Sequence, residues 1–223
     1  RAQNYLRPEH VEKVVSTFHR YQNIPGYARR VSLEEISSAA NDFNLNIRRY
    51  VDNSPPPEPH DVRAHLLGGV PAAEVTDKRP LFDALGFNPA HAFAKREKDP
   101  VYLDFAPALP DRTAIRPLVE NDPGVQARLV KVRQQLAAWW QEHSPRLADL
   151  PKRRDLNRVR TDFLDTFVTA LLRQNASGGS PPLDRFKLAG VIATWWTETL
   201  PDFKTLLENG FPGVMDGWVD AIA

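Results

Sequence analysis

The 223-residue sequence contains no cysteine and only one methionine. The absence of cysteine excludes disulfide bonds and thiolate metal sites, and it is typical of the cytoplasm, where we expect this protein. No apolar run approaches the ~20 residues that a membrane-spanning helix needs. The net charge of +1 excludes a uniformly basic protein that coats DNA, so any contact with nucleic acid must come from a local patch.

Several patterns that carry chemistry are also missing. No serine lies in a Gly-x-Ser-x-Gly context, and no Gly-x-Gly-x-x-Gly loop follows a strand pattern. The six histidines show no pairing four residues apart that would place two of them on one helical face, so a metal site is not predicted. We therefore assign no catalytic, cofactor-binding or metal-ligating residue to this chain.

What the chain does contain is twenty prolines against eleven glycines, 42% hydrophobic and 26% charged residues. The last two values are ordinary for a protein with a packed core. Proline is tolerated in the first turn of a helix and just after its end, so this excess predicts many short helices with sharp boundaries.

The first fifty residues predict two helices and a strand. Apolar residues spaced three and four apart predict a helix from Pro8 to about Tyr21. Ser32 and Glu35 have the spacing of a capping box, which predicts a second helix that ends near Ala40. From Phe43 to Val51, Phe43, Leu45 and Ile47 alternate with Asn44, Asn46 and Arg48, which is the pattern of a half-buried strand.

Three segments in the first third of the chain carry a family resemblance. They are Arg1-Ala2-Gln3-Asn4-Tyr5-Leu6 with the helix behind it, Val31-Ser32-Leu33-Glu34-Glu35-Ile36 running into the Phe43–Val51 segment, and His65-Leu66-Leu67-Gly68-Gly69-Val70-Pro71 with Glu74-Val75. On these segments the chain resembles the modification (M) subunit of type I restriction-modification systems, an adenine-N6 DNA methyltransferase. The second segment is the most specific of the three.

This resemblance implies a parent protein that uses S-adenosylmethionine and works with DNA and with the specificity and restriction subunits of the same system. The chemistry of the family needs a Gly-rich cofactor loop and an Asn-Pro-Pro-aromatic motif that holds the flipped adenine. The nearest string, Ser54-Pro55-Pro56-Pro57, lacks the asparagine and the aromatic residue. We therefore expect a C-terminal fragment that binds no cofactor itself, with the active site upstream.

Beyond this region the patterns divide the chain further. Residues 1–53 are expected to be the end of the methyltransferase-like region, 54–60 a Pro-rich linker, 61–121 short helices with one isolated strand at Val101–Phe105, and 122–223 a helical C-terminal domain. The predicted fold class is mainly α (α+β overall), with a small α/β flank of a methyltransferase domain followed by a multi-helix domain.

The helical domain is predicted from long periodic segments. Asp122 should cap a helix whose apolar residues follow at spacings of four, three, four and three, which is a heptad seam. Further helices are expected at about Lys152 to Arg173 and Leu183 to Thr199, with two short ones at Asp202 to Glu208, stopped by Gly210, and at Gly213 to Ala221. The Leu183 helix is apolar over much of its circumference, which implies burial on more than one side.

Two tryptophan pairs, Trp139-Trp140 and Trp195-Trp196, are the first candidate site. Adjacent helical residues diverge by ~100°, so only one of each pair can point into a given core and the other should lie at an edge or an interface. The structural alternative is that these tryptophans pack in the core beside a domain boundary, which is the more common role of a large aromatic residue. The candidate partner-interface residues are Leu129, Val132, Leu136, Trp139 and Trp140.

Basic residues form the second candidate site. Lys152, Arg153, Arg154 and Arg158 concentrate positive charge at the start of a predicted helix, where cations oppose the helix dipole, so a DNA phosphate track is one reason for their presence. Arg48 and Arg49 are further candidates for DNA contact. The alternatives are a solvated face with Asp149 and Asp155 as partners for the first group, and a structural strand edge for the second.

Two other functions remain open on the sequence alone. One is a non-catalytic helical module for protein interaction, which the heptad seam would suit without any methyltransferase. The other is an autonomous DNA-binding domain that uses the basic residues near Arg153.

Overall fold

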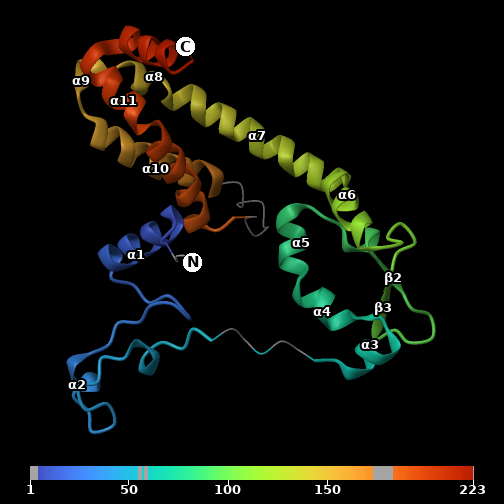
Figure 1. Cartoon of the computed structure of the whole chain (residues 1–223). Coiled ribbons are helices and arrows are strands. Elements are labelled where there is room, and N and C mark those ends of the chain that lie inside the picture. The colour runs from blue at the N-terminus through green and yellow to red at the C-terminus, as the bar shows by residue number, and fades with distance from the viewer. Residues whose placement is uncertain (1–4, 55–56, 58–59, 173–182, 223) are drawn as a thin grey trace. The chain divides into compact units, whose positions relative to one another are not determined.

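The computed structural model describes residues 5–54, 57, 60–172 and 183–222. The chain divides into two compact units, Arg1–His60 and Asp61–Ala223, which are described separately (Figure 1). The predicted Pro-rich linker at 54–60 and the Arg1–Asn4 part of the first family segment lie largely or wholly outside the described residues.

The first unit begins with α1 (Pro8–Arg20), as predicted. Pro8 occupies the first turn, where its missing N–H is not needed, and the backbone N–H of Arg7 donates to Nδ1 of His10 at 3.3 Å. Tyr21 ends the helix in the left-handed conformation (φ 46°) and donates its N–H to the carbonyl of Phe18. The apolar face of this amphipathic helix stays largely exposed in this structure.

The second helix, α2 (Leu33–Ile36), begins where it was predicted and ends earlier. Ser32 Oγ accepts from the Glu35 N–H at 3.2 Å, but the Glu35 carboxylate pairs with Arg29 at 2.8 and 2.9 Å. Ser38 Oγ and Asn41 Nδ2 then both donate to the Glu35 carbonyl. These side chains compete with the backbone ladder, so the helix does not reach Ala40.

The predicted strand from Phe43 to Val51 is wrong. The segment is a loop that leads into a short 3₁₀ helix, η1 (Ile47–Arg49). Asp42 and Phe43 have positive φ values of 43° and 54°, which a strand does not allow. Asn44 Oδ1 accepts from the N–H of Asn46, and Asn46 Oδ1 accepts from the N–H of Arg48. The amides thus form local turns, the use of asparagine that alternation alone does not reveal.

The second unit opens with short elements, which include short helices and the strand expected in residues 61–121, and also elements that were not predicted. They are α3 (Val62–Leu67), β1 (Val70–Pro71), α4 (Ala72–Asp77), α5 (Arg79–Leu85), η2 (Pro89–His91), β2 (Phe93–Lys95), β3 (Tyr102–Phe105), η3 (Arg112–Ala114) and α6 (Ile115–Glu120). The strand expected at Val101–Phe105 is present as β3, but it is not isolated. It is the centre of an antiparallel sheet of order β1-β3-β2, with Val70 opposite Leu103 and Phe93 opposite Phe105.

The rest of the unit is helical: α7 (Pro123–His143), α8 (Pro145–Ala148), α9 (Leu150–Arg153), α10 (Leu156–Leu172) and α11 (Arg185–Ile222). The single helix predicted from Lys152 to Arg173 is wrong at its start, because Arg154 takes a left-handed conformation (φ 52°) and separates α9 from α10.

The helices predicted before and after Pro201 are one helix, and α11 breaks only at Gly210 (φ 68°), as predicted. Trp196 and Phe203 pack on each other across the proline, with ring centroids 4.9 Å apart, so core contacts hold both sides in line.

Two buried clusters make up the core of the second unit. The larger one joins α7, α9, α10 and α11 around the fully buried Phe163, Leu150 and Val159. The smaller one contains Phe87, Ala92, Leu109 and Val125. The predicted fold class, mainly α with a small α/β part, is confirmed, although the three strands lie in the second unit rather than in residues 1–53.

Candidate functional site

The two tryptophan pairs meet at one place in the larger core. Trp139 of α7 and Trp196 of α11 are 5% and 3% exposed, and both pack on Phe163 with ring centroids 5.3 and 6.0 Å away. Their neighbours Trp140 and Trp195 lie at the rim, with Trp140 42% exposed and Trp195 half-buried. Each pair is thus divided between the core and its edge.

A hollow opens between these rim residues, and we call it the aromatic slot. It has a volume of about 360 Å³, and its wall comes from three helices: Leu136, Trp139, Trp140, Phe167, Val191, Ile192 and Trp195. The wall is almost entirely apolar. Trp139 is fixed by an Nε1 hydrogen bond to Thr166 Oγ1 at 3.1 Å. A rigid apolar hollow of this size can receive large apolar side chains or a small apolar ligand.

The predicted heptad residues of α7, which we call the α7 seam, are Val125, Leu129, Val132, Leu136 and Trp139. The two ends of the seam are buried, Val125 in the smaller cluster and Trp139 in the larger one. In between, Leu129 and Leu136 are 41% and 43% exposed. Figure 1 shows α7 as a long helix with α5 and α6 near one end and α8 and α10 at the other. The middle of the seam is therefore open in the described part of the chain.

The predicted basic cluster is split between two helices. Lys152 and Arg153 lie in the last turn of α9, and Arg154 caps its C-terminus, so the helix dipole favours these three cations. The dipole argument for a phosphate track is therefore wrong for them and holds only for Arg158, in the first turn of α10. Lys152 reaches Asp149 at 3.9 Å. Among the described residues no ion pair involves Arg153, Arg154 or Arg158.

The two loop arginines of the first unit have different surroundings. Arg49 Nη1 donates to the carbonyl of Ala40 at 3.0 Å and so helps to close the 41–50 loop. Arg48 is exposed and lines a shallow hollow with Asp52 and Asn53. The structure thus gives Arg49 a side-chain contact, whereas for Arg48 the hydrogen bond seen among the described residues is that of its backbone N–H, which donates to Asn46 Oδ1.

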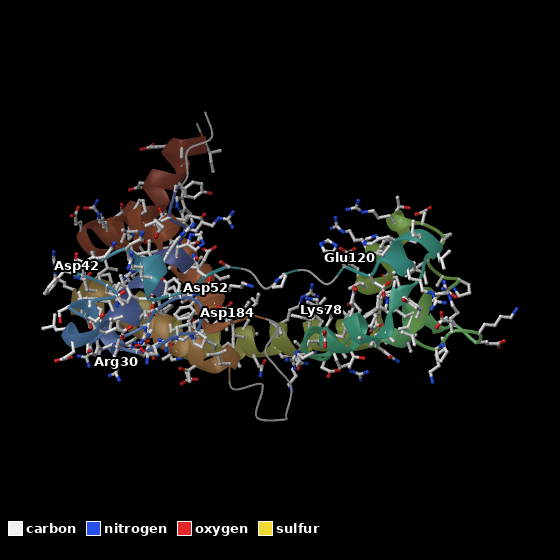
Figure 2. The ribbon with its side chains drawn as sticks, turned by 90° about the horizontal axis from the view of Figure 1, so that it is seen from below. Arg30, Asp42, Asp52, Lys78, Glu120 and Asp184 are labelled. Atoms are coloured by element: carbon white, nitrogen blue, oxygen red, sulfur yellow. The ribbon has the colours of Figure 1, made fainter. Side chains whose placement is uncertain are left out.

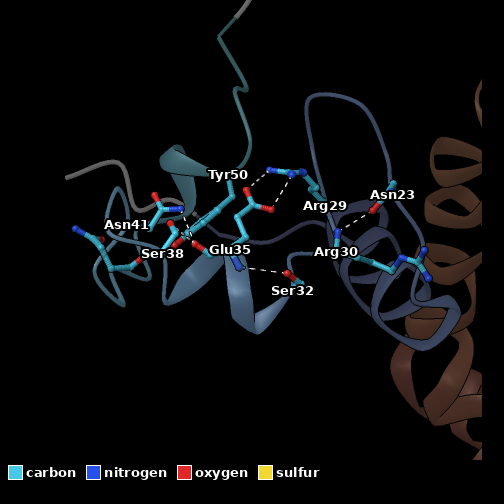
Figure 3. A network of polar contacts seen from close by, with 9 residues as sticks. Asn23, Arg29, Arg30, Ser32, Glu35, Ser38, Asn41 and Tyr50 are labelled. Carbon is cyan, nitrogen blue, oxygen red and sulfur yellow. Dashed lines mark hydrogen bonds and ion pairs between the residues drawn. The ribbon is translucent and has the colours of Figure 1, made fainter.

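A polar network fixes the loop that carries these arginines (Figure 3). It centres on Glu35, whose carboxylate holds Arg29 and whose carbonyl accepts from Ser38 and Asn41. Tyr50 donates its hydroxyl hydrogen to the carbonyl of Asn44. All of these contacts are made within the first unit, so the network itself is structural.

The apolar side chains of the same loop are exposed. Phe43, Leu45 and Ile47 are 69%, 73% and 73% exposed, and Phe18 of α1 is 78% exposed. The sequence placed the first three on the buried face of a strand, and the structure leaves them in the open. Exposed clusters of this kind mark interaction surfaces.

Two polar contacts that the sequence did not indicate hold the second unit together. Tyr102 donates to Asp61 Oδ2 at 2.9 Å, while Asp61 Oδ1 accepts from the N–H of Ala64 and caps α3. The bond from the Ala64 amide, together with the Tyr102 hydroxyl, lowers the pKa of the Asp61 carboxyl, and the same carboxylate raises the pKa of Tyr102. Together they fix α3 to the central strand.

The second contact joins His91 and Asp122. Nδ1 of His91 lies 2.5 Å from Asp122 Oδ2, while Oδ1 accepts from the N–H groups of Gly124 and Val125 at the start of α7. Burial would raise the pKa of Asp122, but these hydrogen bonds outweigh it and the pKa is lowered. The carboxylate therefore anchors the first turn of α7 to η2.

Cations and carboxylates are interspersed over both units, as Figure 2 shows for Arg30 and Asp42 on the first unit and Lys78 and Glu120 on the second. Among the described residues, no group of three or more histidine, aspartate or glutamate side chains could hold a metal ion. In the same part of the chain no helix is long and apolar enough to cross a membrane.

Comparisons with known proteins find similarity over part of the chain. Residues 1–58 match the family described as N-6 DNA Methylase. The chain is also 33% identical over 84 residues to the type I restriction enzyme MjaVII methylase subunit of Methanocaldococcus jannaschii. Part of the chain is thus similar to the N-6 DNA methylases and to a type I methylase subunit, which confirms the resemblance inferred from the sequence.

The extent of this match is limited. The aligned residues are 38% of this chain and 14% of the methylase subunit, so the chain spans only a small part of its relative's length. No solved structure matches the chain.

Proposed function

We propose that this chain is the C-terminal part of a type I modification subunit, an enzyme that transfers a methyl group from S-adenosylmethionine to N6 of adenine in DNA. The observation that carries the proposal is the match of residues 1–58 to the N-6 DNA methylases. In this proposal the chemistry lies in other residues of the parent protein, and this chain contributes the end of the catalytic region and a helical unit for assembly.

The exposed apolar loop supports this division. Leu45 and Ile47 are each 73% exposed although they lie inside the segment that matches the methylase family. Burying an exposed leucine or isoleucine side chain stabilises a protein by ~1.5–3 kcal/mol. We infer that the loop and the apolar face of α1 pack on the catalytic region of the parent protein.

The cofactor does not fit the described residues. An S-adenosylmethionine site of this family would need a Gly-rich turn between a strand and a helix, yet β1 runs directly into α4 without a glycine between them. The segments that join β2 to β3 and β3 to η3, residues 96–101 and 106–111, also contain no glycine. We place the cofactor and the catalytic motif outside this chain and derive no step through them.

The proposed partners follow from the class of the relative. We propose that the helical unit assembles with the specificity subunit, that the restriction subunit joins the same complex, and that DNA contacts involve Arg48, Lys152, Arg153, Arg154 and Arg158, with Arg49 serving the loop. The open α7 seam supports the assembly role, because an exposed apolar helix face needs a cover.

The first test is genetic. The codons that precede Arg1 in the natural gene should encode a Gly-rich loop and an Asn-Pro-Pro-aromatic motif, and the protein they specify should transfer tritiated methyl groups to DNA adenine. A reading frame without these motifs would refute the methyltransferase proposal.

The second test uses the exposed loop. Ile47→Asp should leave the unfolding midpoint of this chain unchanged, but it should lower the stability and the methyl transfer of the longer protein. Ile222→Asp is the matched control, because Ile222 is also exposed (87%) but lies in the second unit. Equal effects of the two substitutions on the longer protein would contradict packing of the loop on the catalytic region.

A further inference from the structure

We propose that the α7 seam and the aromatic slot form one continuous binding surface for an acidic, amphipathic helix of a partner protein. The partner would lie along α7 and insert a large apolar side chain into the slot. The inference rests on the assembly role proposed above and names the chemistry of the partner that this role requires.

The first argument is the open middle of α7. The helix has 21 residues, so it spans ~30 Å, and it is anchored in a buried cluster at each end. Between the anchors Leu129 and Leu136 remain more than 40% exposed. The seam is thus a preformed apolar track, and a partner would not have to order it on binding.

The second argument is the spacing, which selects a helix as the occupant. Residues Val125, Leu129, Val132, Leu136 and Trp139 alternate spacings of four and three. Val125 and Trp139 are buried in the chain's own clusters, so Leu129, Val132 and Leu136 would form the holes into which the knobs of another helix fit. An extended segment would present side chains with a period of two and could not match them.

The third argument is charge. From Pro123 to Gln141, α7 contains Arg128, Lys131 and Arg133 and no acidic residue. Arg133 lies at the position that follows Val132 and flanks the seam. Lys131 and Arg133 are exposed, and neither forms an ion pair with another described residue. A partner helix with glutamate or aspartate beside its apolar stripe is therefore favoured, whereas a second copy of α7 would bring like charges together.

The fourth argument is the slot, which continues the seam. Leu136 and Trp139 belong to both, and Trp140 and Val191 form its rim with 42% and 54% exposure. Tryptophan-lined hollows at the centre of an interface commonly supply most of its binding energy. A leucine, methionine or phenylalanine of the partner helix would fill the slot and fix the register along α7.

The experiment uses the 223-residue chain and a synthetic helical peptide of about four heptads with leucine in its seam and glutamate at the flanking positions. Glutamate flanks keep the peptide from pairing with itself. A second peptide carries lysine in place of glutamate. Binding is measured by fluorescence anisotropy of a label on the peptide, and the tryptophan emission of the chain reports filling of the slot.

We expect the acidic peptide to bind and the lysine peptide to bind at least ~10-fold more weakly. Leu129→Glu should weaken binding of the acidic peptide by ~10-fold or more, whereas Val130→Glu should not. Val130 is the matched control, because it is adjacent, similarly exposed (49%) and off the seam. Arg133→Glu should reverse the preference between the two peptides, and Trp140→Ala should reduce the change in tryptophan emission, because Trp139 and Trp195 also line the slot.

Several outcomes would overturn the inference. They are equal binding of the two peptides, equal effects of Leu129→Glu and Val130→Glu in variants with unchanged helical circular dichroism, or no binding of either peptide. Binding of a small apolar dye in the slot that the peptide does not displace would also count against a helix as the occupant. The methyltransferase proposal is tested separately, since methyl transfer by the longer protein does not depend on these peptides.

Discussion

Trp140 and Trp195 meet edge to face, with their ring centroids 5.8 Å apart and their planes at 88°. They come from α7 and α11, and their sequence neighbours Trp139 and Trp196 both pack on Phe163 beneath them. The two helices are therefore aligned so that the four indoles form two layers, one inside the core and one at its rim. The inner layer stabilises the unit, and the outer layer is available to a partner.

This layering predicts that adjacent tryptophans differ in their effect on stability. Trp139→Ala should lower the free energy of unfolding by ~3–5 kcal/mol, because it leaves a large cavity beside Phe163 and Phe167 and removes the bond to Thr166. Trp140→Ala should cost ~1 kcal/mol or less, as expected for a side chain that is 42% exposed. Urea denaturation followed by circular dichroism measures both, and equal losses would contradict the two-layer arrangement.

A close approach of two glycines predicts a second pair of opposite effects. A Cβ added at Gly124 would lie 2.0 Å from the carbonyl oxygen of Gly86, so α7 starts where only a glycine fits. Gly124→Ala should destabilise the chain by at least ~1–3 kcal/mol. Gly217, in the last part of α11, has no atom within 4 Å of an added Cβ, and Gly217→Ala should stabilise by ~0.4–1 kcal/mol. Thermal unfolding of the two variants should therefore shift in opposite directions.

The elements that the sequence predicted correctly carry local stop and start signals. Asp122 caps α7 through its own carboxylate, Ser32 caps α2, and Gly210 breaks α11 with a φ of 68°. These signals depend on one residue and its immediate neighbours. They are therefore readable without knowledge of the rest of the fold.

The secondary-structure predictions were wrong where the local structure depends on non-local packing or on turns formed by side-chain hydrogen bonds. Alternation from Phe43 to Ile47 resembles a strand, but Asn44 and Asn46 fold the chain on itself. Strands β1 and β2 have only two and three residues, too few for a periodic signal, and they form because β3 lies between them. The break between α9 and α10 falls at Arg154, which is not a glycine, so the sequence did not indicate it. At Pro201 a break was expected, but the contact of Trp196 with Phe203 keeps α11 continuous.

The candidate site was predicted in part. The seam on α7 follows from heptad spacing alone, so its residues could be named from the sequence. The slot could not, because Phe167 and Val191 come from helices whose alignment with α7 depends on the packed core. The sequence signals for it were the two tryptophan pairs, each with one member expected at an edge, and the apolar circumference of the Leu183–Thr199 segment, which indicated burial on more than one side.

The Asp122 carboxylate predicts a pH dependence of stability. Its pKa in the folded chain lies below the ordinary value of 3.8, so ionised Asp122 stabilises the fold above about pH 4, and this stabilisation is lost as the pH falls through the folded-state pKa. Asp122→Asn keeps an oxygen that can cap α7 but removes the charge beside His91. The variant should therefore unfold at lower urea concentration than the natural chain near neutral pH.

That difference should shrink as the pH falls from about 5 to about 3. Asp216→Asn serves as the control, since Asp216 is exposed on α11 and forms no ion pair among the described residues, and it should show no such trend. If the difference in urea midpoint between Asp122→Asn and the natural chain stays constant over this pH range, the charge of Asp122 does not contribute to stability.

The basic cluster provides the last prediction, which concerns DNA. Arg153 and Arg154 are exposed and have no ion-pair partner among the described residues, whereas Arg146 pairs with Asp162 at 2.6 Å. If the first two arginines neutralise phosphates, Arg153→Ala and Arg154→Ala should each reduce the slope of log affinity against log salt by ~0.9 and weaken binding equally for all DNA sequences.

Arg146→Ala removes the same charge but should leave the slope nearly unchanged, because its cation is already paired. Anisotropy titrations of a labelled duplex across a range of salt concentrations would measure these slopes, and an equal reduction in all three variants would point to a general effect of net charge. Because the dipole of α9 already accounts for cations at Arg153 and Arg154, this comparison decides between a phosphate track and a solvated helix end.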